Sequence, residues 1–282
     1  MIISRLFGGA GNQLFQYAAG RALADHLGTD LALDPRYVTS PTNRGDCFVH
    51  FQNARFITTD RLPPAKTDGA LRYFFWRILG RNPRFHRETN LGFNSYFFDL
   101  PDQTYLHGYW QSGKYFESIA DQIRKDLRFT TPLDKANADM AVQIAKAPCP
   151  LALHVRRGDY VVSGAYTACT PDYYRTAARH VAEITGNDPT CFVFSNDPAW
   201  ARENLSLGFD TVIVDHNDET TGHFDLHLQT LCAHNVIANS TFSWWAAWLN
   251  DSPGKCVVAP KEWFAPGHAQ NPDIYPASWH RL

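Results

Sequence analysis

The sequence predicts an α/β protein built on parallel sheets with helices on their faces. Short apolar runs alternate with helical stretches from residue 150 onward, which is the pattern of a doubly wound parallel sheet. The runs are apolar throughout, as strands buried on both faces are. The chain of 282 residues is also long for one core, and Pro148-Cys149-Pro150 cannot continue a helix. We therefore expect two domains, residues 1–149 and 150–282.

Residues 1–149 begin with an apolar run that reads as a strand, followed by a glycine-rich turn and a helix that stops at Gly28. The segments 35–68 and 80–103 have prolines or no clear period, so we expect mostly loops there. The remaining helices follow from apolar residues at four-residue spacing. The expected strands are 2–7, 31–34 and 104–110, and the expected helices are 14–27, 72–79, 113–127 and 134–146.

Residues 150–282 alternate regularly between the two kinds of element. Thr170-Pro171 combines an N-cap residue with proline in the first turn, and Asp197-Pro198 also opens a helix, so each pair predicts a helix start. The tail after about residue 262 is rich in proline and aromatic residues, and we expect it to pack back across the surface. The expected strands are 151–155, 191–195, 211–215, 235–239 and 256–259, and further helices are expected at 224–233 and 243–249.

Composition limits the partners and the compartment. A net charge of −2 gives no general attraction to polyanions, so nucleic acid is not an expected partner. The chain shows no secretory leader, no apolar stretch of the roughly 20 residues that span a bilayer, and six scattered cysteines without a Cys-x-x-Cys pair. We expect a cytoplasmic protein, and loose membrane association stays open.

The segment Leu151–Tyr160 is the most informative one. Its apolar run ends at Arg156 and Arg157, followed by a glycine and Asp159. Ligands of open α/β sheets bind outside the carboxyl ends of the strands, and a guanidinium presents a planar fork of donors that suits phosphate. The alternative is a structural ion pair between Arg157 and Asp159.

Two further strand ends carry polar residues that would meet at the same edge. Ser195-Asn196-Asp197 offers an amide and a carboxylate to a nucleobase, or caps the next helix through Asn196. Asn239 to Ser243 offers hydroxyls and backbone N–H groups at a helix N-terminus, where the helix dipole favours an anion; ordinary capping is the alternative. Their convergence with Arg156 favours an anion-binding edge.

The glycine-rich turn at residues 8–13 also precedes a helix, so its backbone N–H groups are expected to face an anion or a polar ligand. A dinucleotide-binding fingerprint is not supported, because Leu14 stands where its third glycine belongs. His223 and His227 share a helical face, but without the glutamate of a His-Glu-x-x-His motif we expect no zinc site. The sequence has no Asp-x-Asp pair to hold a divalent ion under a diphosphate. Any leaving diphosphate would then be neutralised by arginine and a helix dipole.

Five segments together resemble the bacterial α-1,2-fucosyltransferase family. They follow the family's order from residue 8 to residue 250, which makes the resemblance specific; Gly113 departs from it, because the family more often has an acidic residue there. The segments are GGAGNQLFQYAAGRALA (8–24), GYWQSGKYF (108–116), HVRRGDY (154–160), FSND (194–197) and CAHNVIANSTFSWWAAWLN (232–250).

This resemblance implies a GT-B architecture, in which two Rossmann-like domains face each other across a cleft and the C-terminal domain binds GDP-fucose. It implies an inverting, metal-independent transfer of L-fucose from GDP-β-L-fucose to the 2-hydroxyl of a terminal β-galactoside, in the synthesis of an O-antigen or another surface glycan. No cofactor is expected. A fucosyltransferase of different linkage or acceptor and a catalytically silent sugar-nucleotide-binding protein are the alternatives.

The resemblance also assigns roles to residues. Arg156 would clamp the β-phosphate of GDP, His154 would orient the donor or the arginine, and Asn196 or Asp197 would recognise guanine or ribose. Ser240, Thr241 and Ser243 would line the pyrophosphate. From the N-terminal domain, Gly9, Gly11 and Asn12 would reach the donor, with Asn12 near the reacting sugar. Asp159 and His107 are the candidate general bases. The acceptor-side candidates are His107, Trp110 and Gln111.

Overall fold

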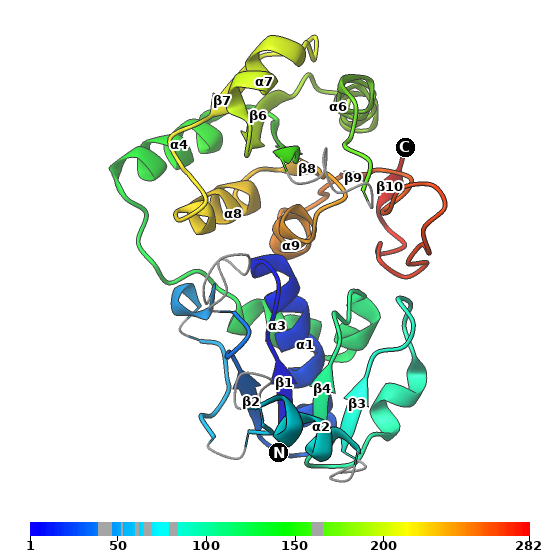
Figure 1. Ribbon diagram of the computed structural model, residues 1–282. Helices are drawn as coiled ribbons and strands as arrows, with labels where there is room; N and C mark the ends of the chain where they lie inside the picture. The colour runs from blue at the N-terminus through cyan, green and yellow to red at the C-terminus, as the bar shows by residue number, and fades with distance from the viewer. Residues whose placement is uncertain (39–46, 52, 60–61, 65–68, 79–83, 159–165) are drawn as a thin grey trace. The chain divides into compact units, whose positions relative to one another are not determined.

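The chain folds into two compact α/β units, each with one parallel sheet (Figure 1). Unit 1 comprises Met1–Arg128 and Pro272–Ile274, and unit 2 comprises Phe129–Asn271 and Tyr275–Leu282. The computed structural model describes residues 1–38, 47–51, 53–59, 62–64, 69–78, 84–158 and 166–282. The parallel α/β class predicted from the sequence is confirmed.

Unit 1 has a four-stranded sheet of order β2-β1-β4-β3, and every pair of neighbours is parallel. The chain runs from β1 to β2 on one side, and β4 lies on the other side of β1, so the order reverses between β1 and β4. The elements are β1 (Ile2–Arg5), α1 (Ala10–His26), β2 (Leu31–Asp34), α2 (Ala70–Ile78), β3 (Phe85–Arg87), β4 (Tyr105–His107) and α3 (Ala120–Asp126), with 3-10 turns at Cys47–His50, Ser95–Asp99, Gly113–Tyr115 and Glu117–Ile119.

The two faces of this sheet are covered differently. On one face α1 lies against β1, where the Ser4 hydroxyl donates to the Gln16 carbonyl at 2.8 Å. On the other face Ile3 and Tyr105 form a small apolar cluster with Phe85 packed against it. Trp76 of α2 contacts the Tyr105 ring with 6.2 Å between ring centroids, so α2 covers this second face.

Unit 2 has a six-stranded sheet of order β10-β9-β8-β5-β6-β7, again parallel throughout. Counted from the first strand, the order is 3-2-1-4-5-6, which is the order of a dinucleotide-binding doubly wound fold. The elements are α4 (Lys135–Lys146), β5 (Pro150–Val155), α6 (Pro171–Thr185), β6 (Thr190–Ser195), α7 (Pro198–Asn204), β7 (Thr211–Val214), α8 (Gly222–Thr230), β8 (His234–Val236), α9 (Thr241–Leu249), β9 (Val257–Ala259) and β10 (His280–Arg281).

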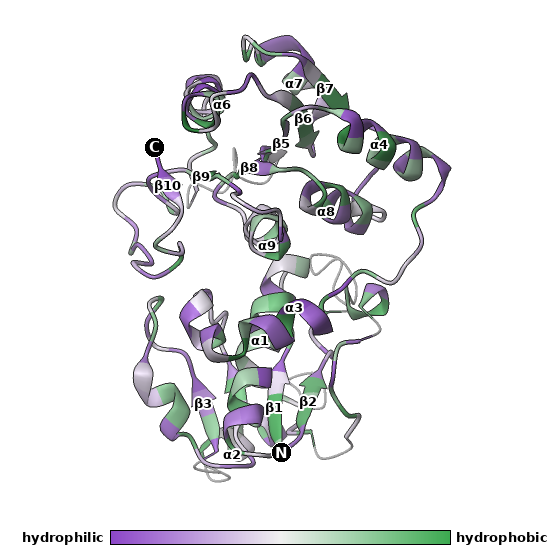
Figure 2. Cartoon of the chain, turned by 180° about the vertical axis from the view of Figure 1, so that it is seen from behind, coloured by the Kyte–Doolittle hydropathy of each residue, from purple (hydrophilic) through white to green (hydrophobic). Residues whose placement is uncertain are grey.

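Alternate residues of β5 belong to two different cores. Leu151, Leu153 and Val155 pack with α6 and α7, whereas Ala152 packs with residues of α4 and α8 on the opposite face. The inner strands β5 and β6 are therefore buried on both sides, and Figure 2 shows β6 in the hydrophobic colour. This double burial explains why these segments read as continuous apolar runs.

Several elements differ from the sequence-based expectation. The strands β3 and β10 were expected as loop and irregular tail, and the expected helix at 113–127 is two 3-10 turns followed by α3. The units divide at Arg128, before α4, rather than at the proline cluster. The reason is that Ile144 of α4 packs on Phe192 and Phe194 in the core of unit 2. Pro150 instead begins β5, at a strand end that needs no N–H donor.

The tail is divided between the two units. Asp273 belongs to unit 1, where its carboxylate accepts from Lys114 Nζ at 2.5 Å and from the backbone N–H of Phe93 at 2.9 Å. The residues after it return to unit 2, where β10 pairs with β9 and Trp279 is buried. Only His280–Arg281 of the tail extend a sheet, and residues 262–279 contain no helix or strand.

Candidate functional site

The strand order of unit 2 reverses between β5 and β8. The chain passes from β5 to β6 and β7 on one side, and then crosses to β8 and β9 on the other. A crevice forms outside the carboxyl ends of the two strands that flank such a reversal, and ligands of open α/β sheets bind there. The sequence places Arg156 after β5 and Ser240 after β8, so both predicted anion-binding segments lie at this point.

The two arginines after β5 have different surroundings. The Arg157 guanidinium lies 3.8 Å from the centroid of the Trp200 ring, and its Nε is 3.8 Å from Asp197 Oδ2. This arginine is held by an aromatic face and a carboxylate, so its charge is already engaged. Arg156 is half-buried beside it. Arg156 follows β5 at the reversal of strand order. Among the described residues Arg157 pairs with Asp197, and the ion pair with Asp159 that the sequence suggested involves a residue outside them.

The polar residues after β6 hold the loop after β5 and the start of α7 in place. The Asn196 side chain accepts from the backbone N–H of Arg157 at 2.9 Å, and its amide lies against Gly158, where a Cβ would come within 2.6 Å of Nδ2. Gly158 also has a φ of +33°, which favours glycine. Asp197 caps α7 by accepting from the backbone N–H of Trp200 at 3.1 Å. The capping residue is thus Asp197, not Asn196 as the sequence suggested, and both side chains have a structural task.

His154 points to the face of β5 that carries α9. Its ring lies 5.4 Å from the Phe242 ring, and it is buried, with a ring Nδ1 that has no hydrogen-bond partner among the described residues. Burial, with a smaller contribution from the Arg156 charge, lowers the pKa of His154 to about 3. The imidazole is therefore neutral, and it offers an unsatisfied nitrogen next to the arginine. Leaving such a group unpaired costs about 1–3 kcal/mol, which a ligand would recover.

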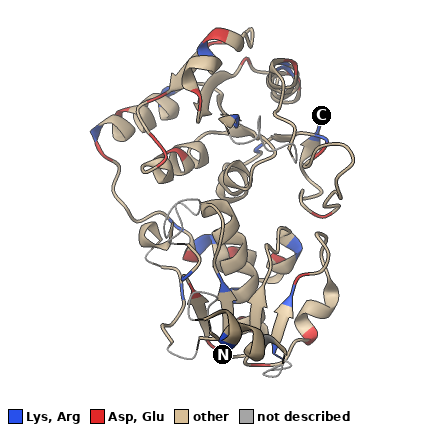
Figure 3. Cartoon of the chain, in the orientation of Figure 1, with Lys and Arg blue, Asp and Glu red and all other residues tan. Residues whose placement is uncertain are grey.

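The N-terminus of α9 completes this edge. Ser240 is the N-cap residue, and its side chain makes no capping hydrogen bond. The helix has no charged residue along its length (Figure 3), so nothing within it offsets the dipole at its first turn. Ser243 is fully buried, and its hydroxyl donates to the Ser240 carbonyl at 3.3 Å, so this hydroxyl faces inward. Thr241, half-buried, and Ser240 remain as hydroxyls at the helix start.

The tryptophans of α9 form part of the core. Trp244 and Trp245 are fully buried, and Trp248 stacks on Trp244 with 6.2 Å between ring centroids. Asn239, just before the helix, donates to the carbonyl of Trp263 at 2.9 Å. These contacts fix the direction of α9, and with it the direction of its N-terminal dipole.

Unit 1 has its own point of reversal, between β1 and β4. There, Gln111 after β4 donates through Nε2 to Asn12 Oδ1 of α1 at 2.8 Å. The preceding turn is tight, because Gly8 has a φ of +79° and a Cβ there would come within 2.6 Å of Asn12 Nδ2. Asn12 and Gln111, proposed separately from the sequence, therefore form one hydrogen-bonded pair.

The glycine-rich turn of unit 1 is less available to an anion than expected. The backbone N–H groups of Asn12 and Gln13 both donate to the carbonyl of Gly9, at 2.9 and 3.1 Å. The Gln13 side chain donates to the carbonyl of Gly8 at 3.0 Å, and Gly11 is buried. Two of the N–H groups expected to face a ligand are therefore used inside the turn, although Gly9 itself has open space around it.

The other acceptor-side candidates lie close to this pair. Trp110 is buried, with its ring 5.1 Å from that of Phe97, so it packs in the core instead of offering a sugar platform. His107 is half-buried at the end of β4, with its ring 5.6 Å from Phe7. Asp159, the other candidate base, lies outside the described residues.

Glu88 is a residue of this edge that the sequence did not indicate. It follows β3, and its carboxylate accepts from the backbone N–H groups of Tyr109 at 2.6 Å and Trp110 at 3.0 Å. Burial raises the pKa of Glu88 to about 7, although both hydrogen bonds oppose that rise. Recognising β3 as a strand would have placed Glu88 at a carboxyl end, but three residues give too little pattern for that.

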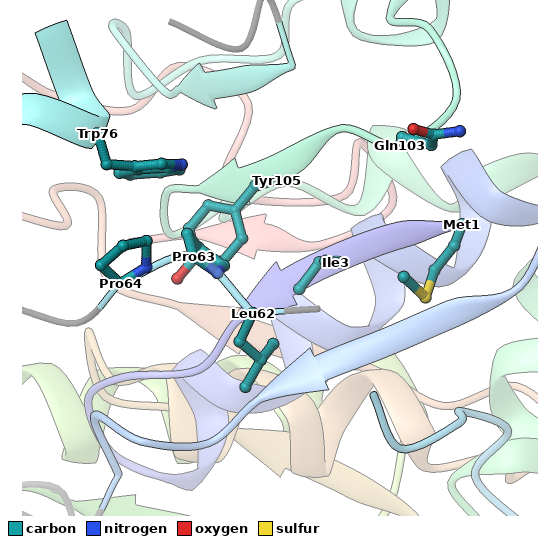
Figure 4. A pocket seen from close by; sticks show the side chains of 8 residues that line it. All are labelled: Met1, Ile3, Leu62, Pro63, Pro64, Trp76, Gln103 and Tyr105. Carbon is teal, nitrogen blue, oxygen red and sulfur yellow. The ribbon is translucent and has the colours of Figure 1, made fainter. Parts of the chain in front are cut away.

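No group of three or more His, Cys, Asp or Glu side chains that could hold a metal ion occurs among the residues described here. His227 of the suggested pair stacks on Phe129, with 4.4 Å between centroids, and burial lowers its pKa. A cavity of about 500 Å³ lies elsewhere in unit 1, beside the amino-terminal ends of β1 and β4 (Figure 4). It therefore lies away from the carboxyl ends of the strands, where ligands of such sheets bind.

Comparisons with known proteins identify relatives of the chain. The chain is 30% identical to the O-antigen biosynthesis glycosyltransferase WbnK of Escherichia coli, over 93% of this chain and 94% of that protein. It is 28% identical to an alpha-1,2-colitosyltransferase of Escherichia coli, over 100% and 99%. With galactoside alpha-(1,2)-fucosyltransferase 1 of Mus musculus it shares 29% identity over 51% of this chain and 41% of the mouse protein.

Solved structures with the same fold include fucosyltransferases. NodZ alpha-1,6-fucosyltransferase soaked with GDP-fucose superposes with a TM-score of 0.57 at 14% identity, over 96% of this chain and 99% of that one. FUT1 of Arabidopsis thaliana in complex with GDP gives 0.55 at 11% identity, over 98% and 74%. The GT-B class expected from the resemblance is thereby confirmed. The model of glycosyl transferase family 11 matches residues 86–282, and the chain is accordingly a glycosyltransferase that belongs to this family.

Proposed function

We propose that this glycosyltransferase moves L-fucose from GDP-β-L-fucose to the 2-hydroxyl of a terminal β-galactoside of a surface glycan, in the cytoplasm, with inversion and without a metal ion. The α-1,2 linkage is supported by the names of the colitosyltransferase and the mouse enzyme. The observation that carries the proposal is the arrangement after β5 and β8 in unit 2. There Arg156, the neutral His154 and the uncapped start of α9 accompany the reversal of strand order.

In this proposal unit 2 binds the nucleotide. Arg156 receives the β-phosphate as a two-pronged donor, and the first turn of α9 faces the pyrophosphate with its N–H groups and the hydroxyls of Ser240 and Thr241. The unpaired ring nitrogen of His154 bonds to the donor. Asn196 and Asp197 shape the pocket by holding Arg157 and α7, rather than reading the base through free side-chain groups.

The reaction is one displacement at the anomeric carbon. The 2-hydroxyl oxygen of the acceptor forms a bond to that carbon while the bond to the β-phosphate oxygen breaks, and GDP leaves with the electron pair. Negative charge grows on the phosphate, so donors already in place at Arg156 and α9 stabilise the transition state most. On the acceptor side, Asn12 and Gln111 orient the sugars.

The hydroxyl proton needs an acceptor, and Asp159 and His107 remain the candidates. Asp159→Asn tests the first of them. If Asp159 is the base, the variant binds GDP with wild-type affinity in calorimetry while transfer falls sharply. If transfer persists, the base is His107 or water, and His107→Gln then distinguishes these two.

The proposed function is tested by incubating the enzyme with GDP-fucose and lactose and determining the linkage of the product by NMR. An α-1,2-linked fucose on galactose, formed equally in EDTA, is the expected result. The matched control acceptor is 2'-deoxylactose, which lacks the attacking hydroxyl and should give no product. Another linkage, no GDP release above background, or activity lost in EDTA and restored by manganese would each overturn the proposal.

Colitose is the second candidate for the transferred sugar, because the colitosyltransferase matches the whole length of the chain. The two donors are compared in the same assay by supplying the colitose nucleotide in place of GDP-fucose. A kcat/KM higher for the colitose nucleotide would assign this sugar instead of fucose.

A further inference from the structure

Helix α2 of unit 1 has an apolar face that is open to solvent. Four of its nine residues are large, apolar and about half exposed or more, and they recur at the i, i+3, i+4, i+7 spacing of one helical face. These residues are Leu71 (72% exposed), Phe74 (52%), Phe75 (52%) and Ile78 (49%). In a helix that packs on a core, this spacing marks the buried face.

The opposite face of the same helix already holds it on the sheet. Tyr73 is buried, and the ring of Trp76 meets the edge of Phe85 at 5.4 Å and of Tyr105 at 6.2 Å between centroids. Trp76 also forms one wall of the cavity described above (Figure 4). The exposed apolar face is therefore not needed to attach α2 to unit 1. A contiguous exposed apolar face of this kind marks a surface that contacts another body.

The charge of the sequence that contains the helix indicates what that body is. From Lys66 to Arg87 the sequence has six Lys and Arg and only one Asp, although the chain as a whole carries a net charge of −2. Arg72 lies on α2 itself and is exposed. A short helix with a strongly apolar face in a basic segment is typical of helices that lie in the interface of an anionic membrane.

We propose that the exposed face of α2 docks unit 1 onto the surface of an anionic lipid bilayer, with Leu71, Phe74, Phe75 and Ile78 at the level of the headgroups. The attachment is peripheral. In the part of the chain that the structure describes, no helix has the length and apolar character needed to cross a bilayer.

A second copy of the chain fits this surface less well than lipid does. In a two-fold dimer the same patch meets itself, so the exposed Arg72 side chains of both copies would be brought together and would repel. An anionic bilayer instead neutralises them, at roughly 1 kcal/mol per basic residue near the surface. The docking is independent of which sugar the enzyme transfers.

The test is co-sedimentation of the full chain with vesicles of equal parts phosphatidylglycerol and phosphatidylcholine. The wild type should bind these vesicles and bind pure phosphatidylcholine much more weakly, with the difference falling as salt is added. The double variant Phe74→Ser/Phe75→Ser should bind these vesicles about tenfold more weakly than the wild type, or more weakly still. Arg72→Gln should weaken binding by a smaller factor.

The matched control is Val142→Ser/Ile184→Ser, which removes apolar residues of similar exposure (52% and 48%) from α4 and α6 of unit 2. It should bind like the wild type, and all variants should transfer sugar to a soluble acceptor at the same rate. No vesicle binding, or equal loss in the control, would overturn the proposal. So would a vesicle-free wild-type dimer that the Phe74→Ser/Phe75→Ser variant converts to a monomer, because the face would then join two copies.

Discussion

Gln111 donates through its side-chain Nε2 to Oδ1 of Asn12, across 2.8 Å, and so ties the loop after β4 to the first turn of α1. This bond decides which way the Asn12 amide is turned: its oxygen faces Gln111, and its nitrogen lies over Gly8. An amide whose orientation is fixed can donate in one defined direction. In this pair, Gln111 therefore holds the Asn12 amide in a position to donate a hydrogen bond.

The change Gln111→Leu should therefore lower kcat while the protein stays folded. Without the bond the Asn12 amide can rotate, and losing one net hydrogen bond of about 1 kcal/mol corresponds to a fivefold to tenfold loss of rate. Steady-state kinetics with GDP-fucose measure this. GDP affinity should stay at the wild-type level, and Gln143→Leu, an exposed position on α4, should change neither. Wild-type kcat in Gln111→Leu would exclude a supporting role.

Arg156→Lys should reduce kcat by about 10²- to 10³-fold, as removal of one well-placed donor to a transition-state oxyanion does. Lysine keeps the charge but loses the planar fork, so the loss reports on geometry rather than on net charge. The measurement is kcat together with the thermal unfolding temperature, which should not change. Arg179→Lys, an exposed arginine on α6, is the matched control and should be silent. Normal turnover by Arg156→Lys would remove this arginine from the mechanism.

The sequence predicted the fold because the strands of unit 2 are buried on both faces, and that burial leaves continuous apolar runs. The sequence did not predict β3 and β10, because these edge strands have only three and two residues and show too little periodic pattern. The sequence also misplaced the boundary between the two units, for another reason. The packing of Ile144 on Phe192 and Phe194 joins residues far apart in sequence, and no local signal marks it.

For the site, the sequence located the strand ends but not the contacts between them. It indicated Arg156 and Arg157 together, and only the structure separates them, because the stacking of Arg157 on Trp200 joins β5 to α7. Likewise, Asn196 and Asp197 are both plausible caps by residue type. The hydrogen bond from the backbone N–H of Trp200 to the Asp197 side chain shows that Asp197 fills this role.

His154 should remain neutral at every working pH, because burial lowers its pKa to about 3. Its ring signals in NMR should not titrate between about pH 5 and pH 8, where an ordinary histidine with a pKa near 6.5 does. A titration in that range would show that water reaches the ring. It would also contradict the assignment of this residue as a neutral partner of the donor.

The lowered pKa of His154 also makes the stability of the protein depend on pH. The folded pKa lies below the unfolded one, so on acidification the unfolded state takes up the proton first. The stabilising contribution is thus present above pH 6.5 and is lost as the pH falls toward 3. His154→Phe keeps a ring against Phe242 and removes this loss. Its stability relative to the wild type in urea should therefore improve from pH 7.5 to pH 5.

The pKa shift of Glu88 changes the stability with pH in the opposite direction. Its pKa is raised to about 7 by burial, above the value near 4.5 of an ordinary glutamate. The folded state therefore binds a proton that the unfolded state does not hold between these pH values. The resulting stabilisation is complete below pH 4.5 and is lost as the pH rises through 7, with a magnitude on the order of 3 kcal/mol.

Glu88→Gln removes this titration and turns an amide donor toward one of the backbone N–H groups of Tyr109 and Trp110. Urea unfolding at pH 5, 6, 7 and 8 should show the wild type most favoured over the variant at pH 5, with the difference shrinking toward pH 8. A constant difference for Glu88→Gln would mean that Glu88 is ionised across the range. The carboxylate would then hold the loop after β4 equally at every pH tested.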